Sequence, residues 1–138
     1  MAGQLTKGIE LINDIPGCGP MADRGSTVTY NARLFLRRGD EVTRDARLIA
    51  RHKEHLVTRC VEGVELVDHT TTLGKRQAIA GVERSLYGMQ VGGYREVLAS
   101  AHLCYRESGI LGLIPPNAML RIHLWVRDVQ GPTTGQRR

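Results

Sequence analysis

The sequence predicts an α+β fold: an antiparallel sheet of about five strands packed against one short helix. Two patterns lead to this expectation. Residues 119–129 alternate between apolar and other side chains, as in a strand with one buried face. Residues 78–89 instead place apolar side chains three or four positions apart, as in a helix with one buried stripe. A chain of 138 residues is long enough for one domain with its own core.

The first 40 residues contain one clear strand. Residues 1–14 are expected to form either a tail or an edge strand, and the domain itself is expected to span 15–130. Residues 15–25 are rich in Gly and Pro, which predicts loop and turns. Residues 26–36 begin with β-branched side chains and continue with apolar ones, so we expect a strand there. A hairpin-like turn at 37–40 follows.

Residues 43–68 form an insertion whose pattern supports two structures. Leu48, Ile49, His52 and Leu56 have helical spacing, whereas residues 57–67 resemble two short strands around Glu62 and Gly63. We expect a helical or irregular piece at 45–54 and a hairpin at 55–69. The insertion also carries five basic residues: Arg44, Arg47, Arg51, Lys53 and Arg59.

The rest of the chain returns to a clearer pattern. Residues 70–76 are expected to run from a strand into a turn. The helix at 78–89 should pack by Val82, Leu86 and Met89 and end near Gly88, because glycine readily adopts a left-handed cap. A strand at 94–98, a long loop at 100–117 and the last strand at 119–129 follow. The polar residues 131–138 are predicted to be a disordered tail.

Composition restricts the partners. No apolar run reaches the ~18 residues that a membrane span needs, and the N-terminus lacks the apolar core of a signal peptide. We therefore expect a cytoplasmic protein with no membrane contact. The net charge of +5 comes from scattered residues, and aromatic residues make up only 4%, which argues against nucleic acid as a partner. An acidic protein partner that binds the basic insertion stays open.

The usual catalytic and metal-binding patterns are weak in this chain. Its three cysteines are odd in number and include no CxxC pair, which favours free, partly buried thiols over disulfides or a zinc site. His102 and Cys104 would share a face of a strand, but no third group orients them. His52 and His55 lack the additional ligands of a metal site. We predict no metal and no cofactor.

The second half of the chain resembles the FKBP-type peptidyl-prolyl cis-trans isomerases. The family's GMxVGxxR run is matched by Gly88, Met89, Val91, Gly92 and Arg95, and its IPPxAxLxF run by Ile114, Pro115, Pro116, Ala118, Leu120 and Ile122. Tyr105 matches the tyrosine of the intervening loop. A GxGxxAxxG run is matched near the N-terminus by Gly17, Gly19, Ala22 and Gly25. The resemblance implies a sheet wrapped around the helix at 79–89 and activity on X-Pro bonds.

The resemblance also implies which residues act. Amide resonance opposes rotation about the peptide bond by ~18–20 kcal/mol, and an apolar pocket with a few donors can lower this barrier without a nucleophile or metal. The implied catalytic residues are Tyr105, through its hydroxyl, Ile79, through its backbone N–H, and Tyr30, as a wall. The implied substrate contacts are Val42, Thr43, Val82, Leu113, Ile114 and Ile122.

Several positions depart from the family pattern. A Phe-Asp pair is replaced by Val42 and Thr43, the floor residue, often Trp or Leu, by Val82, and a strand phenylalanine by His69. The glycine after the loop tyrosine is replaced by Arg106. We expect a smaller, wetter pocket that isomerises proline slowly and binds the family's macrolide ligands poorly.

Two functions remain. The first is a weak peptidyl-prolyl isomerase that acts on proline-containing peptides or proteins, with a folding or chaperone-like role. The alternative is a catalytically inactive FKBP-fold module that binds protein through its basic insertion and apolar loop.

Overall fold

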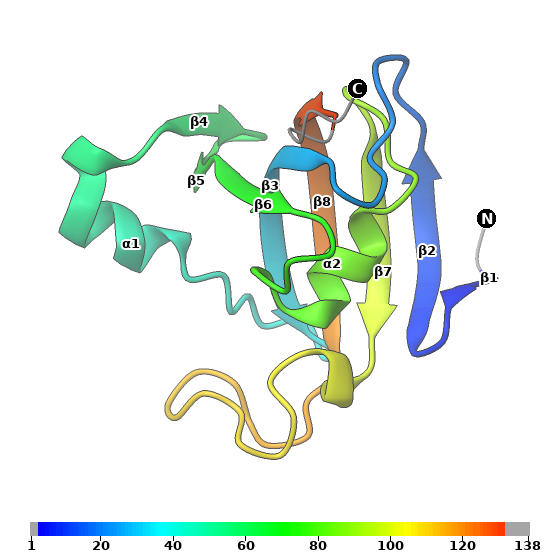
Figure 1. Ribbon diagram of the computed structural model, residues 1–138. Helices are drawn as coiled ribbons and strands as arrows, with labels where there is room; N and C mark the ends of the chain where they lie inside the picture. Colours follow the sequence, from blue (N-terminus) through cyan, green and yellow to red (C-terminus); the bar gives the residue numbers. More distant parts are fainter. Residues whose placement is uncertain (1–2, 132–138) are drawn as a thin grey trace.

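The computed structural model describes residues 3–131, in which a six-stranded antiparallel sheet wraps around a short helix (Figure 1). The strand order is β1-β2-β7-β8-β3-β6. The strands of this sheet are β1 (Gly3–Thr6), β2 (Ile9–Ile15), β3 (Thr27–Leu36), β6 (His69–Thr72), β7 (Tyr94–Ala99) and β8 (Leu120–Gln130). A separate two-stranded hairpin pairs β4 (Thr58–Val61) with β5 (Val64–Val67). The predicted α+β fold is confirmed, with one strand more in the main sheet than the five expected.

Strand β8 supplies the centre of the core. It pairs with β3 on one side and β7 on the other. Its residues alternate as predicted: Leu120, Ile122, Leu124 and Val126 are fully buried, and the residues between them are half-buried on the opposite face. Burying one whole face of a strand in this way stabilises the fold by ~1.5–3 kcal/mol for each large aliphatic side chain.

Helix α2 (Ala80–Leu86) covers the buried face of the sheet. Val82 and Leu86 point into the core, and Met89 continues the same stripe just after the helix. Gly88 has a φ of +83°, so the helix ends with the left-handed residue that the sequence predicted. The confirmed stripe places the first turn of α2, which Ile79 caps, at the edge of the core.

The N-terminal segment is part of the sheet and not a tail. Residues 3–15 form the β1–β2 hairpin, and β2 pairs along its length with β7. Ile9 is almost fully buried, which explains the attachment. Of the two alternatives offered by the sequence, the edge strand is nearer the structure, although β1 alone occupies the edge and β2 lies inside the sheet.

The insertion contains both elements that its ambiguous pattern suggested. Helix α1 (Asp45–His52) and a 3-10 turn, η1 (Lys53–His55), precede the β4–β5 hairpin. Helix α1 stands apart from the sheet in Figure 1, and its one buried residue is Asp45. The Asp45 carboxylate accepts a 2.9 Å hydrogen bond from the Val67 N–H, and the Asn31 amide donates one of 2.9 Å to the Val67 carbonyl. The first bond joins α1 to β5 within the insertion. The Asn31 amide, which also donates a 2.8 Å hydrogen bond to the Asp68 Oδ1, fastens the insertion to β3.

A long connection joins β7 to β8. It begins with the 3-10 turn η2 (Ala101–Leu103) and continues through turns that close on an antiparallel bridge between Ile110 and Ile114. The predicted loop at 100–117 is confirmed. No helix among residues 3–131 is long and apolar enough to cross a membrane.

Two further predictions concern thiols and the C-terminal tail. Cys18 and Cys60 are exposed, contrary to the expectation of partial burial, because they lie in a surface loop and on the free hairpin; Cys104 is half-buried. The predicted disordered tail at 131–138 lies, apart from Gly131, outside the described residues.

Candidate functional site

A cavity of about 540 Å³ lies between β3, α1 and α2, and its volume is within the range of small-molecule sites. One side is formed by the buried face of β3, a second by the start of α2, a third by helix α1, and Tyr105 contributes from the β7–β8 connection. The lining residues are Tyr30, Ala32, Leu34, Val42, Arg44, Asp45, Arg47, Leu48, Arg51, His52, His69, Gln77, Ala78, Ile79, Val82 and Tyr105.

The wall formed by β3 and α2 is apolar. Tyr30, Ala32 and Leu34 follow one another at every second position of β3 and so face the same side. Val42 and Val82 are almost fully buried beside them, at 3% and 4% exposure. Val82 lines the cavity from helix α2.

The Tyr30 hydroxyl is buried near the negative charge of the Asp45 carboxylate. Burial raises the pKa of Tyr30 to about 12, and the nearby Asp45 carboxylate and Tyr105 hydroxyl add to this rise. Asp45 is held in turn by His69, whose Nε2 lies 3.0 Å from the Asp45 Oδ1. The Tyr30 side chain therefore remains a neutral hydroxyl throughout the neutral pH range.

Two hydrogen-bond donors reach the cavity without a fixed acceptor. Ile79 caps helix α2, so its carbonyl accepts from the N–H groups of Val82 and Glu83, at 3.0 and 2.9 Å. Within the described residues its own N–H donates no hydrogen bond. The Tyr105 hydroxyl is the second donor: burial raises the pKa of Tyr105, and the positive charge of Arg44 opposes this rise.

The structure brings together five of the nine residues that the sequence suggested for the site: Tyr30, Val42, Ile79, Val82 and Tyr105. The other four do not line the cavity. The Thr43 hydroxyl instead accepts a 2.8 Å hydrogen bond from the Leu34 N–H and holds the edge of β3. Ile122 is fully buried on the core face of β8, so its side chain is enclosed by the core and does not line the cavity.

Leu113 and Ile114 are displaced by the closure of their loop. Ile114 exchanges backbone hydrogen bonds of 2.8 Å with Ile110 and is only 3% exposed, so its side chain belongs to the core. Leu113 packs half-buried against the same core. The loop tip consequently presents Leu111, which is fully exposed, in place of the two predicted contacts.

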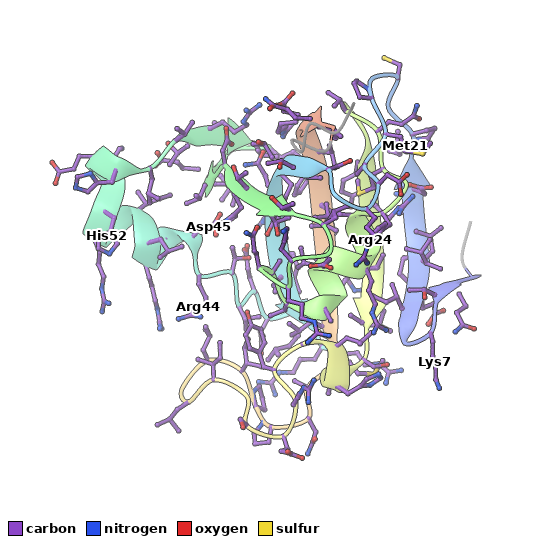
Figure 2. All side chains as sticks on the ribbon, viewed as in Figure 1. Lys7, Met21, Arg24, Arg44, Asp45 and His52 are labelled. Carbon is purple, nitrogen blue, oxygen red and sulfur yellow. The ribbon has the colours of Figure 1, made fainter. Side chains whose placement is uncertain are left out.

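Helix α1 and the residue before it supply a charged part of the site, from basic residues of the insertion that the sequence did not place among the site residues. Arg44, Arg47 and Arg51 line the cavity together with Asp45 and His52. Figure 2 shows Arg44 and Asp45 at the start of α1 and His52 at its end. The positive charge of the insertion was visible in the sequence, and the spacing of three and four between its arginines would have placed them on one helix face. The two remaining basic residues form ion pairs elsewhere, Lys53 with Glu65 and Arg59 with Asp68.

Other chemistry finds little support in the described residues. His102 and Cys104 lie on and after the 3-10 turn η2, not on a strand. Burial raises the pKa of the Cys104 thiol to about 11, so the thiolate needed for nucleophilic attack is scarce at neutral pH. Among the described residues, His, Cys, Asp and Glu form no cluster that could hold a metal ion.

Three comparisons place the chain among known proteins. The model of the FKBP-type peptidyl-prolyl cis-trans isomerase family matches residues 19–124. Peptidyl-prolyl cis-trans isomerase FKBP9 of Rattus norvegicus is 39% identical over 57 residues, 41% of this chain and 10% of that protein. The 46 kDa FK506-binding nuclear protein of Spodoptera frugiperda is 26% identical over 129 residues, 92% of this chain and 27% of that protein. The chain thus spans only a small part of the length of these relatives.

A solved structure has the same fold. The peptidyl-prolyl cis-trans isomerase of Pseudomonas syringae pv. tomato str. DC3000 superimposes with a TM-score of 0.69 at 19% sequence identity. The match covers 94% of this chain and 80% of that one.

Proposed function

This chain belongs to the FKBP-type peptidyl-prolyl cis-trans isomerase family, and we propose that it slowly interconverts the cis and trans forms of X-Pro bonds in other proteins. The observation that carries the proposal is the arrangement of two free donors, the Ile79 N–H and the Tyr105 hydroxyl, beside the apolar wall that β3 and α2 give one cavity. A site of this kind can bind a proline ring and hold the carbonyl that precedes it.

The proposed mechanism uses solvation and hydrogen bonding alone. A planar amide is polar because resonance places charge on its oxygen and nitrogen, and it loses this charge separation as it twists. Transfer from water into the apolar wall of Tyr30, Ala32 and Val82 therefore disfavours the planar form more than the twisted one. The Ile79 N–H would hold the carbonyl of the substrate, and the Tyr105 hydroxyl would hold a neighbouring backbone group, so that the chain rotates about one bond only.

Low activity is proposed because the cavity is only partly apolar. Val82 leaves a shallow floor, and charged residues of α1 form one complete side. Water held by these charges competes with the two donors for the substrate carbonyl. Each donor then contributes only the ~0.5–1.5 kcal/mol typical of a hydrogen bond exchanged with water.

The same charged side supports a second candidate, a protein-binding module without catalysis. A cavity that retains water and bears three arginines can hold a peptide in place without disfavouring its planar amides. This alternative requires binding of proline peptides with no acceleration of their isomerisation.

A role in the folding of other proteins follows from the proposed chemistry, because prolyl isomerisation takes tens to hundreds of seconds without a catalyst. We place this role in the cytoplasm. The two exposed thiols, Cys18 and Cys60, are typical of a reducing compartment.

The test is an exchange measurement by NMR on a short peptide with a Leu-Pro or Phe-Pro bond, in which cis and trans signals are followed directly. Acceleration by catalytic amounts of the protein supports the isomerase. Chemical-shift changes that show binding, without any acceleration, support the module.

A further inference from the structure

Helix α1 presents a row of arginines to the cavity. Arg44 immediately precedes the helix, Arg47 and Arg51 lie four residues apart on one face of it, and all three line the cavity. Leu48 lies between them on the same side. The opposite wall holds Tyr30 and the start of α2, so a peptide between the two walls would touch both.

Few acidic groups in the cavity lining could pair with these three arginines. Asp45 is the only acidic residue among those that line the cavity, and its carboxylate already accepts from the Val67 N–H and lies 3.0 Å from the His69 Nε2. The ion pairs within residues 3–131 use other basic groups, among them Arg33, Arg38 and Arg59. Three like charges around one cavity repel each other, and a bound anion would relieve that repulsion.

The row also lies beside the groups that would act on the amide. Arg44 is close enough to the Tyr105 hydroxyl for its charge to oppose the rise in the pKa of Tyr105. Arg51 lies seven residues further along α1, which corresponds to about 10 Å at 1.5 Å per residue. An extended peptide covers this length with about three residues at ~3.3–3.6 Å each.

We propose that the cavity selects X-Pro segments with an anionic side chain, a carboxylate or a phosphate, one to three residues from the proline. The proline ring lies against Tyr30 and Val82, and the anion binds Arg47 and Arg51, whose planar guanidinium groups suit both anions. The proposal rests on the proposed isomerase function for the orientation of the peptide. The recognition of the anion itself rests on the arginine row.

The test compares matched peptides with the full chain. All share a Phe-Pro bond, and a position two residues before or after the proline carries Gln, Glu, Lys, Ser or phosphoserine. Exchange NMR gives kcat/KM, and chemical-shift titration gives Kd. We expect Glu or phosphoserine to improve kcat/KM and Kd by about ten-fold over Gln or Ser, the effect of one charge-assisted hydrogen bond. Lys should weaken both.

Two double variants test whether the preference for the Glu peptide over the Gln peptide depends on the arginines of α1. In Arg47→Gln/Arg51→Gln, the ratio of the Glu to the Gln peptide should fall to about one. Arg24→Gln/Arg84→Gln removes the same charge from residues outside the cavity lining, and there the ratio should persist. Figure 2 shows Arg24 well away from α1. Circular dichroism of both variants checks that they fold.

Each outcome decides the proposal. A preference for Glu alone or for phosphoserine alone, lost in the α1 variant, supports it and identifies the source of the anion. Equal values for Glu, Gln and phosphoserine overturn it, while the isomerase function survives if neutral peptides are still accelerated. Tight binding of acidic peptides without acceleration retains the proposal and removes the isomerase. Displacement of every acidic peptide by a short single-stranded oligonucleotide at equal concentration overturns it in favour of a nucleic-acid site.

Discussion

The imidazole ring of His69 stacks on the phenol ring of Tyr30, with centroids 5.6 Å apart and 29° between the ring planes. Both rings line the cavity, and the His69 Nε2 lies 3.0 Å from the Asp45 carboxylate. By resemblance to the family, His69 replaces an aromatic residue and Thr43 replaces a carboxylate. In the structure, the His69 imidazole supplies a planar ring to the cavity lining. Asp45, at the start of helix α1 in the insertion, supplies a carboxylate.

The first prediction concerns the titration of Tyr30. Its pKa in the folded chain is raised from 10.0 to about 12, mainly by burial. Since the folded state holds this proton more tightly than the unfolded state, the resulting stability is complete below pH 10 and is lost as the pH rises towards 12. Ultraviolet absorbance of tyrosinate should show two late transitions, from Tyr30 and Tyr94, whose pKa burial also raises to about 12. Tyr30→Phe should remove one; an unchanged titration would contradict the burial of Tyr30.

The second prediction concerns the anchor of the insertion. Asp45→Ala leaves the Val67 N–H without its acceptor and His69 without its partner. Loss of a buried acceptor should lower the free energy of unfolding by about 1–3 kcal/mol. The matched control is Asp40→Ala, which breaks the exposed ion pair with Arg38 and should change stability by less than about 1 kcal/mol. Urea denaturation distinguishes the two, and equal losses would refute the role of Asp45.

The third prediction concerns mobility. Helix α1 buries only Asp45, whereas β8 buries one complete face and pairs on both sides. Regions with little buried apolar surface open locally at low free energy. Amide hydrogens of residues 45–52 should therefore exchange much faster than those of 120–129. Equal protection in mass spectrometry would show that the insertion is as rigid as the core.

The fourth prediction concerns the family's macrolide ligands. We expect weak binding, because valine at positions 42 and 82 offers less contact than an aromatic ring, at a cost of a few kcal/mol. The loss of a carboxylate at Thr43 is partly offset, since Asp45 places a carboxylate in the cavity lining. Nanomolar affinity by calorimetry would show that α1 replaces the lost contacts.

The regular part of the fold was predictable because it depends on periodicity. Strand β8 and the stripe of α2 each repeat one pattern over several residues, and such patterns determine which face is buried. The boundaries shifted by up to three residues, and the β1–β2 hairpin was ambiguous because its apolar residues are few.

The site was only partly predictable because it depends on contacts between distant segments. Tyr30, Ile79 and Tyr105 could be placed by resemblance, whereas the loop of Ile114 closes on Ile110 and withdraws two expected contacts. Most of the aromatic residues also lie outside the cavity lining, which contains only Tyr30 and Tyr105 among Phe, Trp and Tyr. Phe35, Tyr94 and Trp125 surround His123 on the face of the sheet opposite the core, with ring centroids 5.2–6.3 Å from the imidazole. The alternation of residues 119–129 already places His123 and Trp125 on the face opposite Leu120, Ile122 and Leu124, but the rings of Phe35 and Tyr94 join them only through the pairing of distant strands.

The most direct test of the account is the rate of Phe-Pro exchange by wild type, Tyr105→Phe and Val82→Trp. If the cavity is an isomerase site with two donors and a shallow floor, wild type should be slow but measurable. Tyr105→Phe should lower kcat/KM several-fold without abolishing it, as expected for one neutral hydrogen bond of ~0.5–1.5 kcal/mol. Val82→Trp should raise kcat/KM, because a larger apolar floor excludes water from the amide. If wild type and Val82→Trp both match the uncatalysed rate while binding the peptide, the isomerase is contradicted and the chain is a binding module.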